Sequence, residues 1–517
     1  MNAVDLLGYC NPNNTLVVLL DASNASSQSA EIVECYQKAR FPSSRIASAS
    51  ELHNALQLYI DSAVENVIFL GTVDKLPFPS LFRFFSTEPC EHGYTVGVKD
   101  LRESALRWSA FSLNAPQNLP PPLRGTDGPD TFTGITMRER IPGIIRQTIV
   151  SIESIPVAEK QAYDALAQCI GENGPVEDHT DSTLLGELFR VKLARSCRQG
   201  LHWHAISWWL AENYEYFLLD ALHASLKRPD QPDDLFWYLK KRGLEGALPL
   251  FADCAAPLVD AASQTTALTP ALFRLALLRN LWGNKADLSM SGGVVSQKEL
   301  KSDSANLLLL DDIDAVYEYY CRERVTAVTI MADNTGFEVL CDFLLAALLL
   351  HFNAALCITY VVKAAPVFVS DVTLPDVDIT LNAMAASSSA LQWIASTLRE
   401  ARQAGRFVPV ASSFLCTAEP GWNMPLSLAE LLGRQGQQGL LISKGDANYR
   451  RLLGDLHWPY DTAPKAVLEY LPCAVLVMRT MKSNVNIGIS EEQQTRAAQF
   501  DEKWDCSGKV GMIQFYH

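Results

Sequence analysis

The sequence lacks the features that mark several large protein classes. Its twelve cysteines include no C-x-x-C pair, so nothing indicates a thiolate zinc site or a disulfide framework. Reduced, buried thiols of a cytosolic protein are expected instead. The formal net charge is −15 and no basic block is present. This composition argues against a non-specific polyanion binder, and we expect no nucleic-acid partner.

Glycine-rich and long apolar signatures are missing as well. No G-x-x-x-x-G-K-[ST], G-x-G-x-x-G or G-x-S-x-G pattern occurs, which argues against a P-loop, a dinucleotide fingerprint and a serine nucleophile elbow. The first residues lack the charged and apolar regions of a signal peptide. No apolar run approaches the roughly 20 residues of a membrane span. We therefore expect a cytoplasmic protein that makes no membrane contact.

The remaining composition is that of an ordinary globular protein, with 48% hydrophobic and 20% charged residues. A chain of 517 residues is too long for one small core, so two or three domains are expected. The order of patterns suggests a small N-terminal α/β unit with strands at 15–20, 66–70 and 94–98, and then a proline-rich linker. The predicted division is 1–112 for this unit, 113–130 for the linker, 131–300 for a helical domain and 301–517 for an α/β domain.

The helical segment contains a concentration of aromatic residues. Core packing is the ordinary role of such a cluster, and stacking on a ligand is the alternative. Two nearby histidines, His202 and His204, could suggest a metal site, but their aromatic surroundings favour a packed or partly exposed role. The six aromatic residues of the cluster are Trp203, Trp208, Trp209, Tyr214, Tyr216 and Phe217.

In the last segment, short apolar runs alternate with helical patterns, which predicts a parallel sheet covered by helices. Four of these runs break off into polar residues that could handle phosphate or metal. In parallel sheets, ligands bind outside the carboxyl ends of the strands. The four polar ends are therefore expected to share one crevice. The runs are residues 327–332, 366–370, 439–443 and 474–478.

Two of these ends carry candidate metal ligands. Asp333 and Asn334 follow the first run, and Asp371 follows the second. Carboxylate and amide oxygens suit Mg²⁺ or Mn²⁺ and leave coordination positions for water and a phosphate oxygen. The alternative is that Asp333 or Asn334 caps the following helix and Asp371 begins a turn.

The other two ends carry groups suited to a sugar phosphate. After the third run, Gly445 allows close backbone approach, while Asp446 and Asn448 can accept sugar hydroxyls. Arg450 can fork onto a phosphate. Arg479 and its neighbour Lys482 add two cations at the fourth end, where a solvated loop is the alternative.

Taken in order, these motifs resemble the damage-control phosphatases, in the branch of acidic residue methyltransferase-like proteins that carries an R-T-x-K signature. The resemblance rests on residues 333–338, 363–371, 445–450 and 479–482, with weaker matches at 208–214 and 281–289. It covers roughly residues 130–500. The N-terminal unit has no counterpart in typical members and could bind an unknown partner.

The resemblance implies a three-layer α/β/α sandwich with an added helical domain. It also implies a hydrolase, dependent on Mn²⁺, Mg²⁺, Co²⁺ or Ni²⁺, that acts on a small phosphorylated metabolite such as fructose 1-phosphate or fructose 6-phosphate. Asp333, Asn334 and Asp371 would hold the metal, and Asp333 and Asp371 would be catalytic. The substrate residues implied are Arg138, Glu139, Asp333, Asn334, Asp446, Ala447, Asn448, Tyr449, Arg450 and Lys482.

Three questions stay open at the level of sequence. The nucleophile is either a water molecule or a carboxylate, with Asp333 the first candidate. An S-adenosylmethionine-dependent carboxyl methyltransferase is an alternative function, in which Glu338 would contact the cofactor; otherwise Glu338 is a helix N-terminal carboxylate favoured by the helix dipole. A non-catalytic binding protein is the third possibility.

Overall fold

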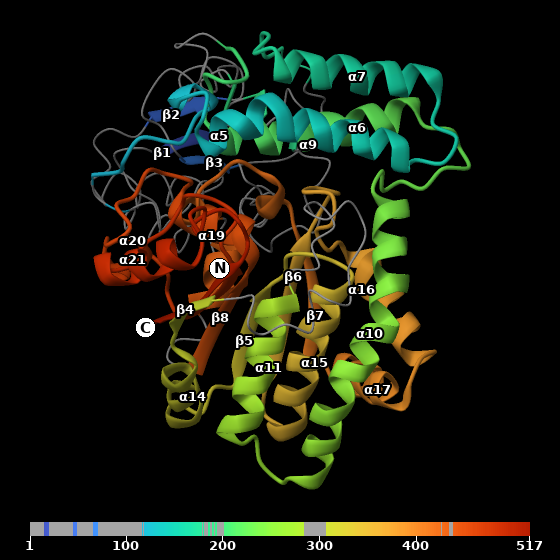
Figure 1. Cartoon of the computed structure of the whole chain (residues 1–517), viewed down its shortest axis with the longest axis vertical. Coiled ribbons are helices and arrows are strands. Elements are labelled where there is room, and N and C mark those ends of the chain that lie inside the picture. Colours follow the sequence, from blue (N-terminus) through green and yellow to red (C-terminus); the bar gives the residue numbers. More distant parts are fainter. Residues whose placement is uncertain are drawn as a thin grey trace.

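The structure is a computed structural model, and Figure 1 shows helices lying across one end of a sheet whose faces are covered by further helices. Helices α6 (Ile141–Ser151), α7 (Val157–Gly171) and α9 (Trp208–Leu226) form the layer across the end, and α10 (Trp237–Gln264), α11 (Pro270–Gly283) and α15 (Phe337–Phe352) run along the sheet. The residues that the structure describes are 15–19, 45–48, 66–70, 116, 118–177, 201–283, 307–424, 426–433 and 438–517, with 179, 185, 186, 189, 190, 192 and 193.

The central sheet has seven strands in the order β4-β10-β9-β8-β5-β6-β7. The five strands from β9 to β7 are parallel, whereas β10 pairs antiparallel with β9 and parallel with β4. The predicted mostly parallel sheet is therefore confirmed. The strands are β4 (Leu307–Asp311), β5 (Ala327–Met331), β6 (Cys357–Lys363), β7 (Phe407–Ser412), β8 (Gly439–Lys444), β9 (Ala474–Thr480) and β10 (Val510–Tyr516).

Both faces of the sheet are buried. Every residue of β8 and β9 is buried, as expected for continuous apolar strands covered on two sides. Alternate residues of β8 face different cores, since Leu440 and Ile442 belong to one hydrophobic cluster and Leu441 to the other. Two separate cores on opposite faces of one sheet make the predicted three-layer arrangement.

Helices from two parts of the chain cover the face of the sheet to which Leu440 and Ile442 contribute. α15 lies between the sheet and two earlier helices, α10 and α11, and it is buried on all sides from Phe337 to Leu350. A helix enclosed in this way needs no polar stripe, which explains its continuous apolar sequence. The helices of this face are α10 (Trp237–Gln264), α11 (Pro270–Gly283), α14 (Ile313–Arg322), α15 (Phe337–Phe352), α16 (Leu374–Ala385) and α17 (Ser389–Gln403).

Shorter helices follow the strands that carry the candidate substrate residues. α19 begins directly after β8 and ends at Gly454, which adopts a left-handed conformation with φ of 73°. This is the usual glycine cap of a helix C-terminus. The remaining elements after β7 are η12 (Ser413–Cys416), η13 (Gly421–Asn423), α18 (Leu426–Gly433), α19 (Gly445–Leu453), α20 (Pro464–Leu468) and α21 (Glu491–Phe500).

The helical layer at the end of the sheet contains most of the aromatic cluster. Trp203 and Tyr214 are buried, so core packing is confirmed for them, whereas Trp208 and Tyr216 line the cleft described below. The histidines have the expected packed or partly exposed roles, because His204 is buried and hydrogen-bonds the carbonyl of Ile170, whereas His202 is exposed and hydrogen-bonds the carbonyl of Asn173. The elements of this layer are η7 (Gly125–Asp127), α5 (Phe132–Ile135), the π-helical turn η8 (Thr136–Arg140), α6 (Ile141–Ser151), α7 (Val157–Gly171) and α9 (Trp208–Leu226).

The N-terminal segment contributes a separate three-stranded parallel sheet in the order β2-β1-β3. The strands predicted at 15–20 and 66–70 are confirmed as β1 (Thr15–Leu19) and β3 (Asn66–Leu70). The sequence patterns did not predict β2 (Arg45–Ser48). The strand predicted at 94–98 lies outside the described residues.

One predicted strand is wrong. Residues 366–370 form a turn, not a strand. Phe368 and Val369 have positive φ angles of 51° and 67°, a conformation that no strand contains. Pro366 before them has no N–H to donate to a strand ladder. The strand of this region is β6, which ends at Lys363, so Asp371 lies in the loop beyond it.

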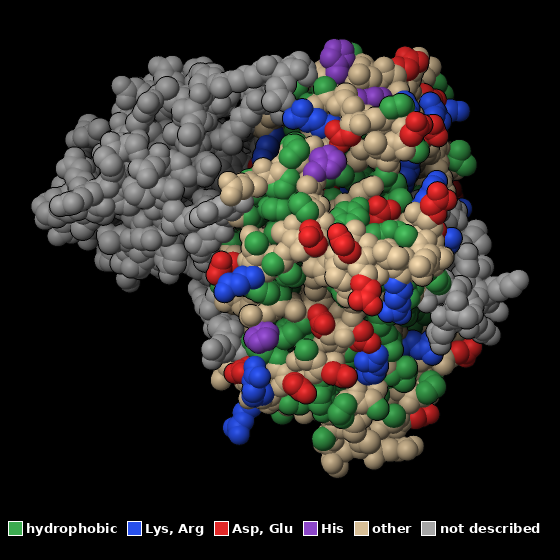
Figure 2. Space-filling model, turned by 60° about the vertical axis from the view of Figure 1, so that its left-hand side comes forward, with side chains coloured by type: hydrophobic (Ala, Val, Ile, Leu, Met, Phe, Trp, Pro, Cys, Tyr) green, Lys and Arg blue, Asp and Glu red, His purple; other side chains and the backbone are tan. Residues whose placement is uncertain are grey.

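Surface charge and helix length are consistent with the composition. On the described part of the face shown in Figure 2, acidic and basic side chains are interspersed rather than gathered by sign. Among the helices that the structure describes, none is long and apolar enough to cross a bilayer.

Candidate active site

A cleft lies between the helical layer and the carboxyl ends of the parallel strands. The segments after β9, β8, β5 and β6 contribute to its floor in the order of the strands in the sheet. About 550 Å³ of space lies between its atoms, part of it open to solvent. Its lining residues are Arg140, Ile144, Trp208, Glu212, Tyr216, Asp333, Asn334, Phe368, Asp371, Asp446, Ala447, Arg450 and Lys482.

Backbone pairing brings Asp371 beside Asp333 and Asn334. The loop after β6 folds back so that Asn334 and Asp371 form an isolated antiparallel bridge. Two backbone hydrogen bonds join the segments on either side of this bridge. Val372 N donates to Asp333 O at 2.9 Å, and Thr335 N donates to Ser370 O at 2.7 Å. The left-handed turn just before Ser370 makes this reversal possible. Asp371 therefore reaches the cleft by a loop reversal, not as the end of a strand.

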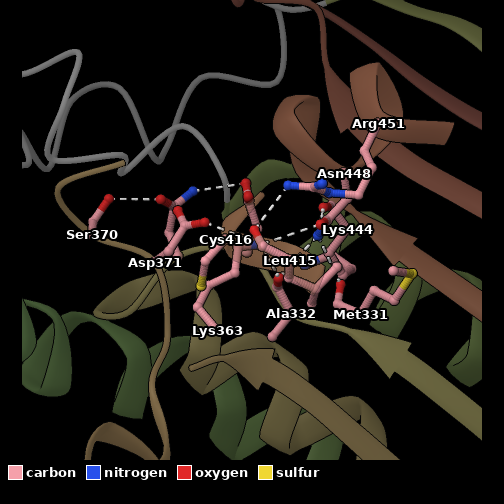
Figure 3. A network of polar contacts seen from close by, with 12 residues as sticks. Met331, Ala332, Lys363, Ser370, Asp371, Leu415, Cys416, Lys444, Asn448 and Arg451 are labelled. Atoms are coloured by element: carbon pink, nitrogen blue, oxygen red, sulfur yellow. Dashed lines mark hydrogen bonds and ion pairs between the residues drawn. The ribbon is translucent and has the colours of Figure 1, made fainter. Parts of the chain in front are cut away.

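Hydrogen bonds orient the Asn334 amide. Its Nδ2 donates to Asp333 Oδ2 at 2.9 Å and to Glu338 Oε2 at 3.0 Å. Its Oδ1 accepts a hydrogen bond from the Ser370 hydroxyl at 2.6 Å. The two N–H groups of the amide are held by carboxylates, and its oxygen meets the Ser370 hydroxyl on the loop that carries Asp371. Figure 3 shows Ser370 and Asp371 on this loop, beside Lys363.

The two candidate carboxylates are buried, and two acidic and two basic groups act on Asp333. Asp333 and Asp371 are 5% and 1% exposed. Burial raises the pKa of Asp333 well above its usual value, and the charges of Glu338 and Asp371 raise it further, against the opposing effect of Lys363 and Lys482. A nearby cation would favour the ionised form of Asp333.

The donor set fits a hard divalent cation. Asp333, Asn334 and Asp371 offer carboxylate and amide oxygens, the ligands that Mg²⁺ and Mn²⁺ prefer. Within the described residues, no group of three or more His, Cys, Asp or Glu side chains could hold a metal. A site here therefore needs the amide oxygen of Asn334 as well as the two carboxylates.

Helix α19 places only part of its predicted substrate motif in the cleft. Asp446, Ala447 and Arg450 line the cleft, on the side of the helix that faces the helical layer. Asn448 lies behind them, where its Nδ2 donates to Ala332 O and Lys444 O at 2.9 Å each. Tyr449 is fully buried, and its hydroxyl accepts a hydrogen bond from Ile487 N. Asn448 and Tyr449 thus hold α19 against the sheet and are not part of the cleft surface.

The two cations after β9 differ in their surroundings. Arg479 is fully buried and pairs with Asp446 Oδ1 at 3.1 Å, so the alternative of a solvated loop is wrong for it. Its guanidinium lies 4.3 Å from the centre of the Tyr449 ring. Lys482 lines the cleft, and its backbone N–H donates to the same Asp446 oxygen at 3.3 Å. Arg479 therefore orients Asp446, whereas Lys482 belongs to the cleft itself.

The π-helical turn at Thr136–Arg140 presents a different residue from those the resemblance indicates. Arg138 hydrogen-bonds the carbonyl of Pro129, and Glu139 is exposed. Neither residue lines the cleft, but Arg140 does. A π-helical turn changes the direction of successive side chains relative to an α-helix, and such turns are frequent at functional sites.

One wall of the cleft was not predicted from the sequence. Trp208, Glu212 and Tyr216 line it from α9, and Phe368 stacks on the neighbouring Trp209. The spacing of Trp208, Glu212 and Tyr216, four residues apart, places them on one face of the helix. The aromatic concentration was the available signal, since stacking on a ligand was the alternative role for Trp208 and Tyr216.

A buried ion network lies under the cleft. Lys444, at the end of β8, donates to Glu338 Oε1 and Asp342 Oδ1 at 2.8 Å each. Asp342 also accepts hydrogen bonds from Asn280 and Tyr360. Glu338 is 1% exposed and does not line the cleft. The network therefore fixes Glu338, which in turn holds the Asn334 amide.

We expect Lys444→Met to destabilise the fold strongly. The substitution leaves two buried carboxylates without their cation, which typically costs about 3–5 kcal/mol. Chemical denaturation of the metal-free protein measures this change. Lys241→Met is the matched control, because Lys241 pairs with Glu245 at 4.0 Å on the surface, and such pairs contribute about 0–1 kcal/mol. Equal, small effects of the two substitutions would contradict the assigned role of Lys444.

Comparisons with known proteins cover the parts of the chain that form the cleft. The family model described as damage-control phosphatase ARMT1-like domain matches residues 136–497. Damage-control phosphatase ARMT1 of Xenopus laevis is 26% identical over 431 residues, covering 74% of this chain and 96% of the relative. The Homo sapiens protein is 26% identical over 77% of this chain and 98% of its own length. The Bos taurus protein is 31% identical over 46% of this chain and 57% of its own length.

A solved structure is also similar. It is a DUF89 family protein from Pyrococcus horikoshii, with 13% sequence identity and a TM-score of 0.40, covering 74% of this chain and 98% of that one. All residues that line the cleft lie within the range of the family match.

Proposed function

Because the chain belongs to the damage-control phosphatases with an ARMT1-like domain, we propose that it is a metal-dependent phosphatase that hydrolyses a sugar phosphate of the fructose 1-phosphate or fructose 6-phosphate type. The observation that supports this proposal is the composition of the cleft. Asp333, Asn334 and Asp371 lie at one side of it, and Arg450 and Lys482 line it from the segments after β8 and β9. Oxygen ligands and cations in one cleft are the groups that phosphoryl transfer requires.

The metal would be held by Asp333, Asn334 and Asp371. Mn²⁺, Mg²⁺, Co²⁺ and Ni²⁺ are the candidates. When bound, a divalent ion supplies Lewis-acid polarisation of a phosphate oxygen.

The other residues of the cleft would bind and orient the substrate. The Lys482 ammonium and the Arg450 guanidinium would neutralise the phosphate oxygens. The Asp446 carboxylate, which Arg479 holds in place, would accept a hydroxyl of the sugar. Trp208, Tyr216 and Phe368 line the cleft with aromatic rings, which would exclude water and pack on the carbon skeleton.

Two candidates remain for the nucleophile, a water molecule and the Asp333 carboxylate. If Asp333 attacks phosphorus, its bond to the phosphoryl group forms as the bond to the sugar oxygen breaks, and water then cleaves the acyl phosphate. Rapid-quench trapping of a phosphorylated protein distinguishes the two routes. A burst of protein-bound phosphate at Asp333 supports the carboxylate, and its absence during rapid turnover supports water.

A screen of phosphorylated metabolites tests the proposed function. Purified protein would be assayed for release of inorganic phosphate with each of the four metals and with a chelator. We expect release from one or more small sugar phosphates that requires a divalent metal. Absence of phosphate release from all substrates with every metal would contradict the proposal.

The placement of Glu338 argues against the methyltransferase alternative. A residue that contacts a cofactor must be reachable from a cleft, whereas Glu338 is buried and held by Lys444 and Asn334. Calorimetric titration with S-adenosylmethionine checks this directly, and we expect no binding at this position.

A further inference from the structure

We propose that Glu212, on helix α9 of the helical layer, is a positioning residue that aims one nitrogen of Arg450 at the phosphate of the substrate. This inference rests on the proposed function for the identity of the anion. It assigns a role to the helical layer, because the anion-binding group on the sheet side would be complete only when α9 lies against it.

Three contacts fix the Arg450 guanidinium. Nη1 donates to Glu212 Oε2 at 2.6 Å, and Nε donates to Asp455 Oδ1 at 2.7 Å. The face of the group stacks on Trp208, with 3.6 Å between the guanidinium carbon and the ring centre. Burial by itself would lower the pKa of Arg450, but the carboxylates of Asp455 and Glu212 outweigh this effect and raise the pKa above its usual value. Arg450 is therefore a permanent cation in a fixed plane.

The third nitrogen of the guanidinium has no protein acceptor among the described residues. Nη2 of Arg450 is buried and has no hydrogen-bond partner among those residues. Arg450 lines the cleft and is 4% exposed. A buried charged donor without an acceptor is unfavourable. An anionic oxygen of a ligand in the cleft would satisfy it.

The geometry of the Arg450 guanidinium explains how Glu212 positions it. Asp455, just after α19, holds Nε, and the Trp208 ring sets the plane of the group. Glu212 holds Nη1 from the opposite layer and so fixes the direction in which Nη2 points. Asp455 already supplies one balancing charge, so a second carboxylate is not needed for neutralisation. A guanidinium anchored at two of its three nitrogens presents the third in one direction.

Charge alone predicts the opposite effect of removing Glu212. A carboxylate that lines the cleft repels an anionic ligand, so its loss would strengthen phosphate binding if Glu212 only balanced charge. If Glu212 positions Arg450, its loss weakens phosphate binding. The sign of the change in affinity therefore separates the two roles.

The test is calorimetric titration of inorganic phosphate into the full-length protein loaded with Mn²⁺. We expect Glu212→Met, which removes the acceptor for Nη1 at similar side-chain size, to raise the Kd for phosphate by about tenfold or more, the effect of losing a well-oriented hydrogen bond from a charged group. Glu215→Met is the matched control on the same helix. Glu215 is buried, does not line the cleft, and has no hydrogen-bond partner among the described residues, so we expect its substitution to leave the Kd unchanged.

A second variant shows whether Glu212 acts through Arg450. In an Arg450→Met background, adding Glu212→Met should leave the Kd unchanged or lower it, because the group that Glu212 positions is gone and only its repulsion of the anion remains. Thermal unfolding of every variant identifies loss of fold. An unchanged or lower Kd for folded Glu212→Met would overturn the inference, as would failure of the wild-type protein to bind phosphate. If the wild type binds phosphate but hydrolyses no phosphomonoester, the proposed function fails while the titrations still decide the role of Glu212.

Discussion

Asp333→Asn is expected to reduce metal-dependent phosphate release by about 1,000-fold or more. Asp333 lines the cleft beside Asn334 and Asp371, and the substitution removes its charge at nearly constant volume. An amide is a weaker ligand for a hard cation and cannot act as a nucleophile. Loss of one preorganised charged group at a reacting centre typically costs about 10²–10³-fold, and Asp333 would serve both as a ligand and as a candidate nucleophile.

The same substitution should leave the metal-free fold intact. The pKa of Asp333 is raised in the folded protein, chiefly by burial and also by Glu338 and Asp371. An acid of this kind opposes folding increasingly as the pH rises from its unfolded pKa toward its folded pKa, because the unfolded chain ionises first. Neutral asparagine removes this effect, so at pH 7 we expect an unchanged or higher free energy of unfolding.

Activity and stability must be measured together for this prediction. Denaturation at pH 7 gives the stability, and phosphate release gives the activity. Asp378→Asn is the control, because Asp378 is exposed and pairs with Arg402 on the surface, and its activity should be that of the wild type. Activity of Asp333→Asn within about threefold of the wild type would contradict the assignment of Asp333.

Gly445→Ala is expected to abolish activity for a steric reason. Gly445 begins α19 directly opposite the Asp333 carboxylate and has a φ of +77°. A Cβ atom at this position would lie 1.8 Å from Asp333 Oδ2 and 2.1 Å from its Cγ. Either the carboxylate or the start of α19 must move. We expect a loss of at least about 100-fold in phosphate release, since misplacement of a catalytic group by about 1 Å has this effect.

A second glycine separates this contact from backbone strain. Gly405 has a similar φ of +69°, but a Cβ atom added there would meet nothing within 4 Å. Gly405→Ala should therefore cost about 1–2 kcal/mol of stability through its left-handed conformation alone and leave activity unchanged. Equal activities of the two alanine variants would show that the approach of Gly445 to Asp333 is unimportant.

The sheet could be predicted from the sequence where burial is complete. The runs at 439–443 and 474–478 are apolar without interruption because β8 and β9 are covered on both faces. β7 escaped prediction because this edge strand leaves Val408 and Val410 partly exposed and contains Pro409. Residues 366–370 gave a false signal. Their apolar side chains fill the space above the sheet from a turn, so composition alone could not separate them from a strand.

Sequence predicted the cleft residues that follow a strand or share one face of a helix, but not the contacts between distant segments. Asp333 and Lys482 directly follow buried strands, and the rule for parallel sheets places them at the same edge. Helical periodicity explains why only part of the α19 motif lines the cleft. Asp446 and Arg450 lie four residues apart on one face of α19, whereas Asn448 and Tyr449 lie on another. Glu212 is 238 residues from Arg450 in sequence. No periodic pattern joins such residues, so this contact required the tertiary structure.

The location of the metal tests the account most directly. A crystal of the full-length protein soaked with Mn²⁺, with data collected near the manganese absorption edge, would show bound metal as an anomalous difference peak. We predict one strong peak within about 2.0–2.4 Å of a carboxylate oxygen of Asp333, a carboxylate oxygen of Asp371 and the amide oxygen of Asn334. A fully soaked crystal with no peak between these residues, or with its strongest peak outside the cleft, would contradict the account.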